Sequence, residues 1–254
     1  MREVSALTAA ALIIGDEILS GRTQDVNLAA IARFLAPLGI DLAEARMVPD
    51  VESEIVTAVN ALRTRYTYLF TTGGIGPTHD DITADAIGVA LGLPVEHNEA
   101  ALAILAARYK PADFNDKRRR MARMPRGASL IHNPISAAPG FQIANVFVMA
   151  GVPKIMEAML QDVRPRLANC APVVARSLRT DLPEGRIAAA LEKIQLAQPA
   201  VKIGSYPSFA GAVLGAGTGT TLVVRGRDIA EVEIAAAEIS RMAAEFGGAA
   251  VAET

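Results

Sequence analysis

Residues 71–83 read Thr71-Thr72-Gly73-Gly74-Ile75-Gly76-Pro77-Thr78-His79-Asp80-Asp81-Ile82-Thr83. The apolar run at residues 66–70 predicts a buried strand before this segment, and the residues after it predict a helix. Glycines let the backbone come close to a phosphate, and N–H groups at the start of a helix can donate hydrogen bonds to it. We therefore predict that this turn binds a phosphate or a nucleotide.

Asp80 and Asp81 are unexpected in a phosphate-binding turn because their charges repel the ligand. A divalent cation between them and the phosphate, or a proton transfer, would account for both. The alternative is that one of them caps the following helix, which needs a single such residue. Two acids beside three glycines exceed that need, so we favour a functional role. No Gly-Lys-Ser/Thr follows the glycines, which argues against a typical P-loop ATPase.

The composition predicts a folded α/β protein with one large and one small domain in 254 residues. Hydrophobic residues make up 51% of the chain, and a net charge of −2 argues against binding nucleic acid. No apolar stretch reaches the roughly 18 residues of a membrane span, and residues 1–14 do not resemble a signal peptide. Cys170 is the only cysteine, so it forms no intrachain disulfide and is interpreted as a packing residue. We predict a cytoplasmic protein that binds no membrane.

Predicted strands and helices alternate through the first part of the chain, which we assign to a domain at residues 5–170. This alternation predicts a mostly parallel sheet with helices on both faces and ligands at the carboxyl ends of the strands. The predicted strands are 9–14, 40–48, 66–71, 129–132, 141–143 and 145–150, and the predicted helices are 27–38, 53–65, 84–91, 98–109, 115–124 and 154–168.

The pattern changes near residue 171, and residues 171–250 are predicted to form a small α+β domain. Residues 211–219 contain four glycines and are interpreted as a mobile hairpin loop, and the alanine-rich tail after Gly247 as frayed. The predicted strands here are 173–179, 201–206 and 220–225, and the predicted helices are 184–197 and 229–246.

Further acids and amides follow the other predicted strands of the first domain. Gly15-Asp16-Glu17 follows the first strand, and these carboxylates could hold a cation or a ribose hydroxyl. Helix capping by Asp16 is an equally good explanation, and both alternatives stay open. Asp50 and Asn27, taken alone, are interpreted as helix caps.

The strongest basic run is Lys117-Arg118-Arg119-Arg120, with Arg123 and Arg126 after it. We interpret this run as a solvated helical face, in preference to a phosphate clamp or a subunit contact. His79, His97 and His132 lack the spacing of paired metal ligands and are interpreted as incidental.

Several motifs together resemble the competence/damage-inducible protein A (CinA) family. They are Gly15-Asp16-Glu17-Ile18-Leu19-Ser20-Gly21, Asp25-Val26-Asn27, Val48-Pro49-Asp50, residues 71–83, Pro139-Gly140 and Gly151-Val152-Pro153. Gly204-Ser205-Tyr206-Pro207 and residues 223–227 resemble the small domain that follows in such proteins. The resemblance does not extend to the nicotinamide-mononucleotide deamidase domain of longer members, so that activity is not expected.

The resemblance implies a three-layer α/β/α fold, like the molybdopterin-binding domain, and a homodimer or homotrimer. CinA-type domains are known as metal-dependent ADP-ribose pyrophosphatases, and related domains of eukaryotic FAD synthases hydrolyse FAD. Molybdopterin enzymes of similar fold instead bind a pterin phosphate and adenylylate it or insert metal. The expected ligand is therefore a nucleotide or a pterin phosphate. Mg²⁺, Mn²⁺ or Co²⁺ is the expected cofactor, and K⁺ and molybdopterin stay open.

The motif positions then predict residue roles. A cation would be held by some of Asp16, Glu17, Asp80 and Asp81, and a remaining carboxylate would orient water. The catalytic residues are predicted to be Asp81, Asp50 and Glu17, with Asp16, Asp80 and Asp81 as metal ligands. The substrate-binding residues are predicted to be Gly15, Asn27, Thr72, Gly73, Gly74, Gly76, Thr78, Pro153 and Lys154. Lys154 stands where many members have glutamate, which either weakens the metal assignment or adds a phosphate contact.

Overall fold

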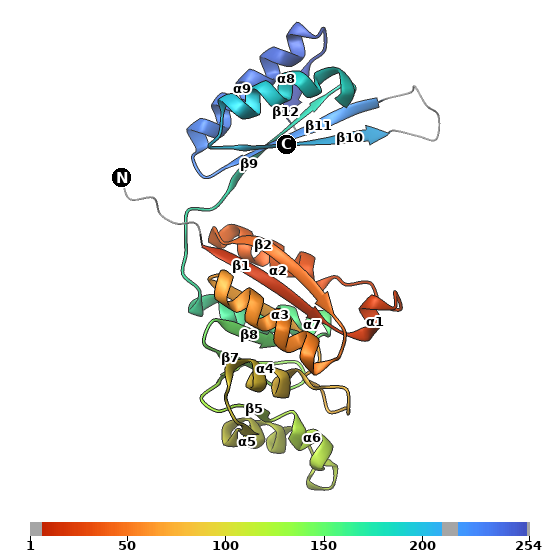
Figure 1. Ribbon diagram of the computed structural model, residues 1–254, viewed down its shortest axis with the longest axis vertical. Coiled ribbons are helices and arrows are strands. Elements are labelled where there is room, and N and C mark those ends of the chain that lie inside the picture. The colour runs from red at the N-terminus through yellow and green to blue at the C-terminus, as the bar shows by residue number, and fades with distance from the viewer. Residues whose placement is uncertain (1–6, 210–217, 253–254) are drawn as a thin grey trace. The chain divides into compact units, whose positions relative to one another are not determined.

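The computed structural model describes residues 7–209 and 218–252, and the chain divides into two compact units, residues 1–170 and 171–254 (Figure 1). The first unit is built on a six-stranded sheet with the order β2-β1-β3-β8-β7-β6. The first four strands in this order are parallel, and β7 and β6 are antiparallel additions at one side. Its strands are β1 Thr8–Ile14, β2 Asp41–Val48, β3 Tyr68–Thr72, β6 Ser129–Ile131, β7 Gly140–Ile143 and β8 Val146–Met149.

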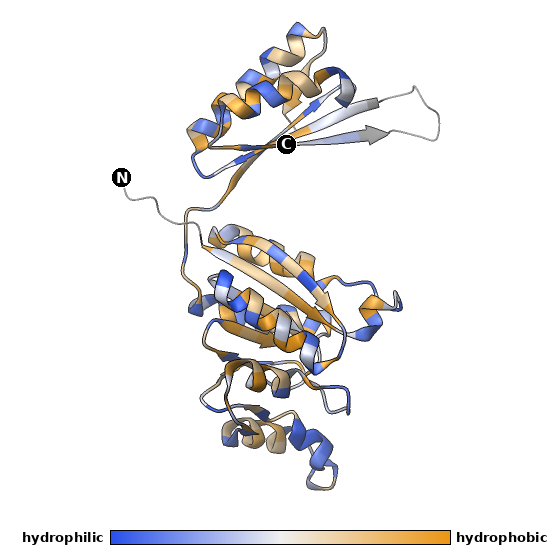
Figure 2. Ribbon diagram, viewed as in Figure 1, coloured by the Kyte–Doolittle hydropathy of each residue, from blue (hydrophilic) through white to orange (hydrophobic). Residues whose placement is uncertain are grey.

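Helices cover both faces of this sheet, because alternate residues of its central strands are apolar on both sides. Leu12 of β1 packs with α3 (Glu52–Arg65), α4 (Thr83–Leu91) and α5 (Glu99–Arg108). Its neighbour Ala11 packs on the opposite face with α2 (Asn27–Leu35) and α7 (Pro153–Val163). The predicted three-layer α/β/α architecture is confirmed, and Figure 2 shows the apolar residues concentrated in the central strands.

Shorter elements complete the first unit. They are α1 Asp16–Leu19, the 3-10 turns Ala36–Leu38, Pro111–Asp113 and Arg164–Arg166, α6 Asp116–Arg120, and the strand pair β4 Val95–His97 and β5 Arg123–Pro125. The helix predicted over residues 115–124 is wrong in its second half, because α6 ends at Arg120 and β5 follows. Pro125 disfavours a helical conformation at Met124, and the buried Met124 side chain joins the core instead.

The second unit is a four-stranded antiparallel sheet with the order β10-β11-β9-β12 and two helices. Leu178, Leu222 and Val224 of the sheet pack against α8 and α9 in one apolar core. The elements are β9 Val174–Thr180, α8 Glu184–Ala197, β10 Lys202–Phe209, β11 Thr218–Gly226, α9 Ile229–Glu245 and β12 Ala250–Ala252. This sheet and its two helices confirm the predicted small α+β domain.

The expectation of a frayed tail after Gly247 is wrong. Residues 250–252 form β12, which pairs with β9 from Ala250 opposite Thr180 to Ala252 opposite Leu178. Pairing at the edge of an existing sheet compensates for the low strand propensity of alanine. Of the predicted loop at 211–219, residues 211–217 lie outside the described residues, and Thr218 and Gly219 belong to β11. No helix in the described part of the chain is long and apolar enough to cross a membrane.

Candidate functional site

The predicted site residues lie at the carboxyl ends of the parallel strands, because β2, β1, β3 and β8 run side by side in one direction. Backbone hydrogen bonds join the turns that follow these strands. The Gly15 amide donates to the Val48 carbonyl at 3.1 Å, and the Gly73 amide donates to the Met149 carbonyl at 3.1 Å. Ligands bind at this edge in open parallel sheets, so the location agrees with a binding site.

The turn after β3 requires glycine at two positions. Gly73 has φ +105°, and a Cβ atom there would lie 2.1 Å from the Ile14 carbonyl oxygen. Gly74 has φ +65°, and its Cβ would lie 2.2 Å from Thr83 Oγ1. Only glycine adopts these left-handed angles where there is no room for a Cβ atom. Backbone atoms therefore form the surface of the turn at these two positions.

Thr83 fixes this turn to the start of α4, a role that the sequence analysis missed. Its hydroxyl donates to the Gly73 carbonyl at 2.9 Å, and its amide donates to the Gly74 carbonyl at 3.0 Å. The side chain is fully buried. A threonine at the first residue of a helix, ten residues after a glycine pair, was the only sequence signal for it.

The structure corrects one part of the predicted phosphate cradle. The Gly73 amide is already bonded to the Met149 carbonyl, so it cannot donate to a ligand. The amides of Gly74, Ile75 and Gly76 form no hydrogen bond within residues 7–209 and 218–252. These three consecutive amides are the donors that the turn can offer to an anion.

The Asp81 carboxylate is held against this turn. Its Oδ2 accepts hydrogen bonds from the Thr78 amide at 2.7 Å and from the Thr78 hydroxyl at 2.5 Å. A Cβ at Gly76 would lie 2.6 Å from the same oxygen, so the carboxylate occupies the space left by that glycine. Its Oδ1 accepts no hydrogen bond from any described residue and can face a cation or water.

Neither aspartate of the turn caps α4, so that alternative is wrong. The residue at the N-cap is Ile82, and no side chain bonds there. The Asp80 side chain is 61% exposed. Hydrogen bonding, first from the Thr78 side chain, lowers the pKa of the Asp80 carboxyl, so it is ionised at neutral pH.

Asp50 also does not cap its helix, because Val51 occupies the N-cap of α3. Its Oδ2 instead accepts a hydrogen bond from the Asp16 amide at 2.9 Å, 34 residues away in sequence. Burial raises the pKa of the Asp50 carboxyl, and the charges of Asp16, Glu17 and Asp80 raise it further against the opposing effect of that hydrogen bond. The Asp50 carboxylate therefore lies close enough to Asp16, Glu17 and Asp80 to be repelled by their charges, and a bound cation would offset that repulsion.

The raised pKa of Asp50 predicts a pH-dependent cost in stability. As pH rises from the ordinary value of 3.8 through the raised native pKa, the unfolded chain loses this proton before the folded chain does. The folded state then binds more protons, so its stability falls over that window. Asp50→Asn should lack this fall, and its stability relative to the wild type should increase from acidic to neutral pH in urea titrations. A constant difference across the window would contradict the raised pKa.

Asn27 connects α2 to the loop that follows β8. It lies inside α2 and is not its cap, because Asp25 Oδ2 accepts from the Leu28 amide at 3.0 Å. The Asn27 Nδ2 donates to the Gly151 carbonyl at 2.7 Å, and its Oδ1 is buried without a partner in the described chain. The Thr72 hydroxyl is buried without a partner as well. Asn27 thereby positions Gly151, whose Cβ would lie 3.3 Å from the Gly73 Cα.

Pro153 and Lys154 begin α7 just after this loop, and both are exposed. Gly15 and Glu17 stand at the end of β1, where the α1 N-cap is Gly15 and makes no side-chain cap bond, so Asp16 does not cap α1. The structure thus places the turns that carry the predicted residues along one edge of the sheet.

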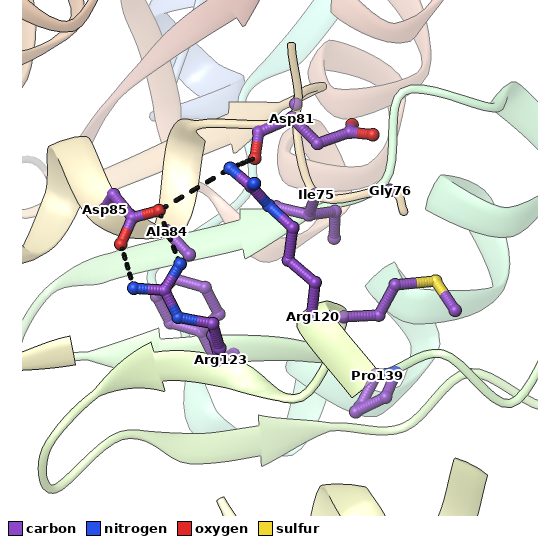
Figure 3. A pocket seen from close by; sticks show the side chains of 11 residues that line it. Ile75, Gly76, Asp81, Ala84, Asp85, Arg120, Arg123 and Pro139 are labelled. Carbon is purple, nitrogen blue, oxygen red and sulfur yellow. Dashed lines mark hydrogen bonds and ion pairs between the residues drawn. The ribbon is translucent and has the colours of Figure 1, made fainter. Parts of the chain in front are cut away.

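A small pocket lies beside the glycine turn and contains only part of the predicted set. Among the predicted site residues, Gly74, Gly76 and Asp81 line it. Part of the lining comes from residues 120–141, far along the chain from the turn, and Figure 3 shows Arg120 of this segment reaching toward Asp81. Its remaining lining residues are Ile75, Ala84, Asp85, Arg120, Met121, Arg123, Pro139 and Phe141.

The basic run is not simply a solvated face, which corrects that interpretation. Arg118 stacks over the Tyr109 ring at 4.2 Å, and Arg119 over the Phe114 ring at 4.8 Å. Arg120 and Arg123 reach into the pocket, where both interact with Asp85. The sequence contained no local signal for this, because both arginines are at least 35 residues away from Asp85 in the chain.

A metal site made only of protein side chains is absent from the described residues, since no three His, Cys, Asp or Glu side chains are arranged to hold one ion. Mg²⁺ in nucleotide sites uses one or two carboxylates, waters and substrate phosphates. The grouped acids Asp16, Asp50 and Asp80, with Asp81 on the turn, suit that kind of binding.

Comparison with known proteins places this geometry in a family. Residues 10–169 match the family described as "Probable molybdopterin binding domain", and residues 172–247 match the family described as "FAD synthase, middle domain". A protein of Pyrobaculum arsenaticum is 36% identical over 205 residues, covering 76% of this chain and 77% of its own. A protein of Aeropyrum pernix is 33% identical over 205 residues, covering 76% of each chain.

A solved structure supports the same assignment. The crystal structure of the protein CinA with unknown function from Thermoplasma acidophilum has a TM-score of 0.60 and 33% sequence identity. It covers 63% of this chain and 98% of that chain. The match at residues 10–169 spans more than half of the 254 residues. This chain therefore belongs to the molybdopterin-binding domain family, and its first unit has the fold of CinA.

Proposed function

We propose that this protein hydrolyses the diphosphate bond of a nucleotide, with ADP-ribose as the substrate and a divalent metal ion as cofactor. One observation carries the proposal: the Asp81 carboxylate is held beside three consecutive amides that have no protein acceptor among the described residues. Amides alone would suit any anion, but a carboxylate at the same place opposes a simple anion site. Hydrolysis needs both features, because the phosphate must be held and a water must lose a proton.

The amides of Gly74, Ile75 and Gly76 would donate to the phosphate oxygens. Their positions are set before the ligand arrives, because Thr83 bonds two carbonyls of the turn and Gly73 packs against Ile14. A preorganised turn stabilises the charge that develops in the transition state without further rearrangement.

One or two of the carboxylates of Asp16, Asp50 and Asp80 would hold the metal ion, with waters and substrate oxygens as the other ligands. The ion would neutralise phosphate charge and lower the pKa of a water bound to it. The mutual repulsion that contributes to the raised pKa of Asp50 supports a cation there. Glu17 belongs to the same group of charges.

Asp81 would accept the proton of the attacking water through its Oδ1. The water oxygen bonds to one phosphorus atom, and the bridging oxygen leaves with its electron pair on the other phosphate. ADP-ribose and water then give AMP and ribose 5-phosphate, and the proton passes to the carboxylate. This role gives Asp81 the direct contact with the reacting water.

The test is AMP release from ADP-ribose by the purified full chain, followed by chromatography. We expect AMP in the presence of Mg²⁺, Mn²⁺ or Co²⁺ and none in EDTA. No AMP with any of the three ions would refute the proposed reaction. Equal turnover in EDTA would refute the metal requirement alone.

A second candidate is a module that binds molybdopterin without turnover, which the family match at residues 10–169 favours. Tight pterin binding together with no hydrolysis of ADP-ribose would support it. A molybdopterin adenylyltransferase is the third candidate, and it would consume ATP and molybdopterin together.

A further inference from the structure

We propose that Arg120 is a phosphate-binding residue, and that its guanidinium holds one phosphate of the ligand bound at Gly74–Gly76. The identity of that ligand as a diphosphate rests on the proposed function. The anion site itself rests on the pocket in Figure 3, where Arg120 lies opposite the glycine turn.

The first reason is that most hydrogen-bond donors of Arg120 are unused. A guanidinium has five N–H donors, and within residues 7–209 and 218–252 that of Arg120 makes one hydrogen bond, from Nη2 to the Asp81 carbonyl at 3.1 Å. Its side chain is 32% exposed, so the group is half-buried at the pocket. Such a group loses part of its hydration and gains most from an anion that accepts two parallel hydrogen bonds.

The second reason is the local balance of charge. Arg123 binds both oxygens of Asp85, at 3.0 and 2.7 Å, so this pair neutralises itself. Arg120 lies 3.8 Å from Asp85 Oδ2, too far for a hydrogen bond. The Asp81 carboxylate points away from Arg120 toward Gly76 (Figure 3). Arg120 therefore shares the single negative charge of Asp85 with the more closely bound Arg123, so the two guanidiniums carry more positive charge than this carboxylate neutralises.

The third reason is that two separate sets of donors border one pocket. The amides of Gly74, Ile75 and Gly76 come from the turn after β3, and Arg120 comes from the end of α6. A phosphate has enough acceptor oxygens to bond to backbone amides and to a guanidinium at once. A neutral ligand would leave the excess positive charge of Arg120 and Arg123 over Asp85 unbalanced.

Asp85 and Arg123 then act as positioning residues. Asp85 stands in the first turn of α4, and Arg123 in β5, so their paired bonds tie α4 to the segment that carries Arg120. The Asp81 carbonyl holds the tip of Arg120 on the turn itself. Together they keep the guanidinium next to the amides without using up its charge.

The experiment measures binding by the full chain, with isothermal titration of ADP-ribose and of inorganic pyrophosphate, in EDTA and in MgCl₂. The variants are Arg120→Ala, Arg120→Lys and the control Lys117→Ala. Lys117 is exposed on the same helix and does not line the pocket, so its removal changes net charge equally. Circular dichroism and melting curves confirm that each variant is folded.

We expect Arg120→Ala to lower the affinity for both ligands roughly tenfold to hundredfold, as for the loss of a pair of charged hydrogen bonds. The affinity of Arg120→Lys should lie between those of the wild type and Arg120→Ala, because lysine keeps the charge but not the paired N–H donors of the guanidinium. The affinity of Lys117→Ala should stay within about twofold of the wild type. Equal affinity of Arg120→Ala and Lys117→Ala would overturn the proposal. So would weakening of ADP-ribose alone, because Arg120 would then contact the nucleoside, or no binding of either ligand by the wild type.

Binding and turnover separate this inference from the proposed function. If the wild type binds ADP-ribose but releases no AMP, the hydrolase proposal fails, and the Arg120 variants still decide the anion site. If AMP is released and Arg120→Ala binds like the wild type, only the inference about Arg120 fails.

Discussion

Asp81→Asn is expected to lower the turnover of ADP-ribose by about 10²- to 10⁴-fold, the usual contribution of a general base. Asparagine has the same shape, and its Oδ1 can still accept the hydrogen bonds from the Thr78 amide and hydroxyl. The turn should therefore keep its conformation while losing the group that accepts the proton. AMP release at saturating ADP-ribose with metal present measures the effect, and melting curves show whether the fold is intact.

The matched control is Asp116→Asn, which removes the same charge from an exposed position on α6 outside the pocket. Its turnover should equal that of the wild type. Asp81→Asn with wild-type turnover would exclude Asp81 as the base. Equal losses in both variants would show that net charge, not the position of the carboxylate, is responsible.

Gly73→Ala is expected to destabilise the first unit by about 3 to 5 kcal/mol. The new methyl group would lie 2.1 Å from the Ile14 carbonyl oxygen, at φ +105°. That oxygen belongs to β1, which pairs with β2 and β3 and cannot move without breaking the sheet. Urea and thermal unfolding followed by circular dichroism measure the loss in the free energy of unfolding. A variant that does not fold at all would show the same destabilisation at a larger magnitude.

Gly92→Ala separates the two causes of this cost. Gly92 caps α4 at φ +67° with no atom within 4 Å of an added Cβ, so it has the strained angle but no clash. We expect it to cost about 1 kcal/mol, the strain of a left-handed alanine. Equal losses at Gly73 and Gly92 would mean that the close approach to β1 does not limit the turn.

Much of the architecture was predictable because it depends on local pattern. Apolar runs such as residues 9–14, alternating with amphipathic helices, predict a parallel sheet with two covered faces. The helices predicted at 27–38 and 84–91 stop directly before Gly39 and Gly92, and both glycines have left-handed angles at these helix ends. The glycines after β3 predicted a tight turn, since few residues tolerate such backbone angles.

The capping interpretations were wrong for a physical reason. An aspartate or asparagine beside a helix can cap it or bond elsewhere, and local sequence does not distinguish the two. Asp50 bonds to the Asp16 amide across 34 residues, and Asn27 bonds to the Gly151 carbonyl across 124 residues. Both bonds exist because strand order brings the turns together at one edge of the sheet.

The chain's periodicity and its glycines thus established the layers of the first unit, the turn after β3 and the acids near it. Tertiary packing alone decided that the Gly73 amide donates a hydrogen bond to the Met149 carbonyl. It also decided that Arg120 donates to the Asp81 carbonyl, 39 residues away in sequence. Periodicity reports which face of an element is buried, because burial repeats with the geometry of the helix or strand. Which polar group meets which across the fold depends on how those elements pack, and no local pattern carries that information.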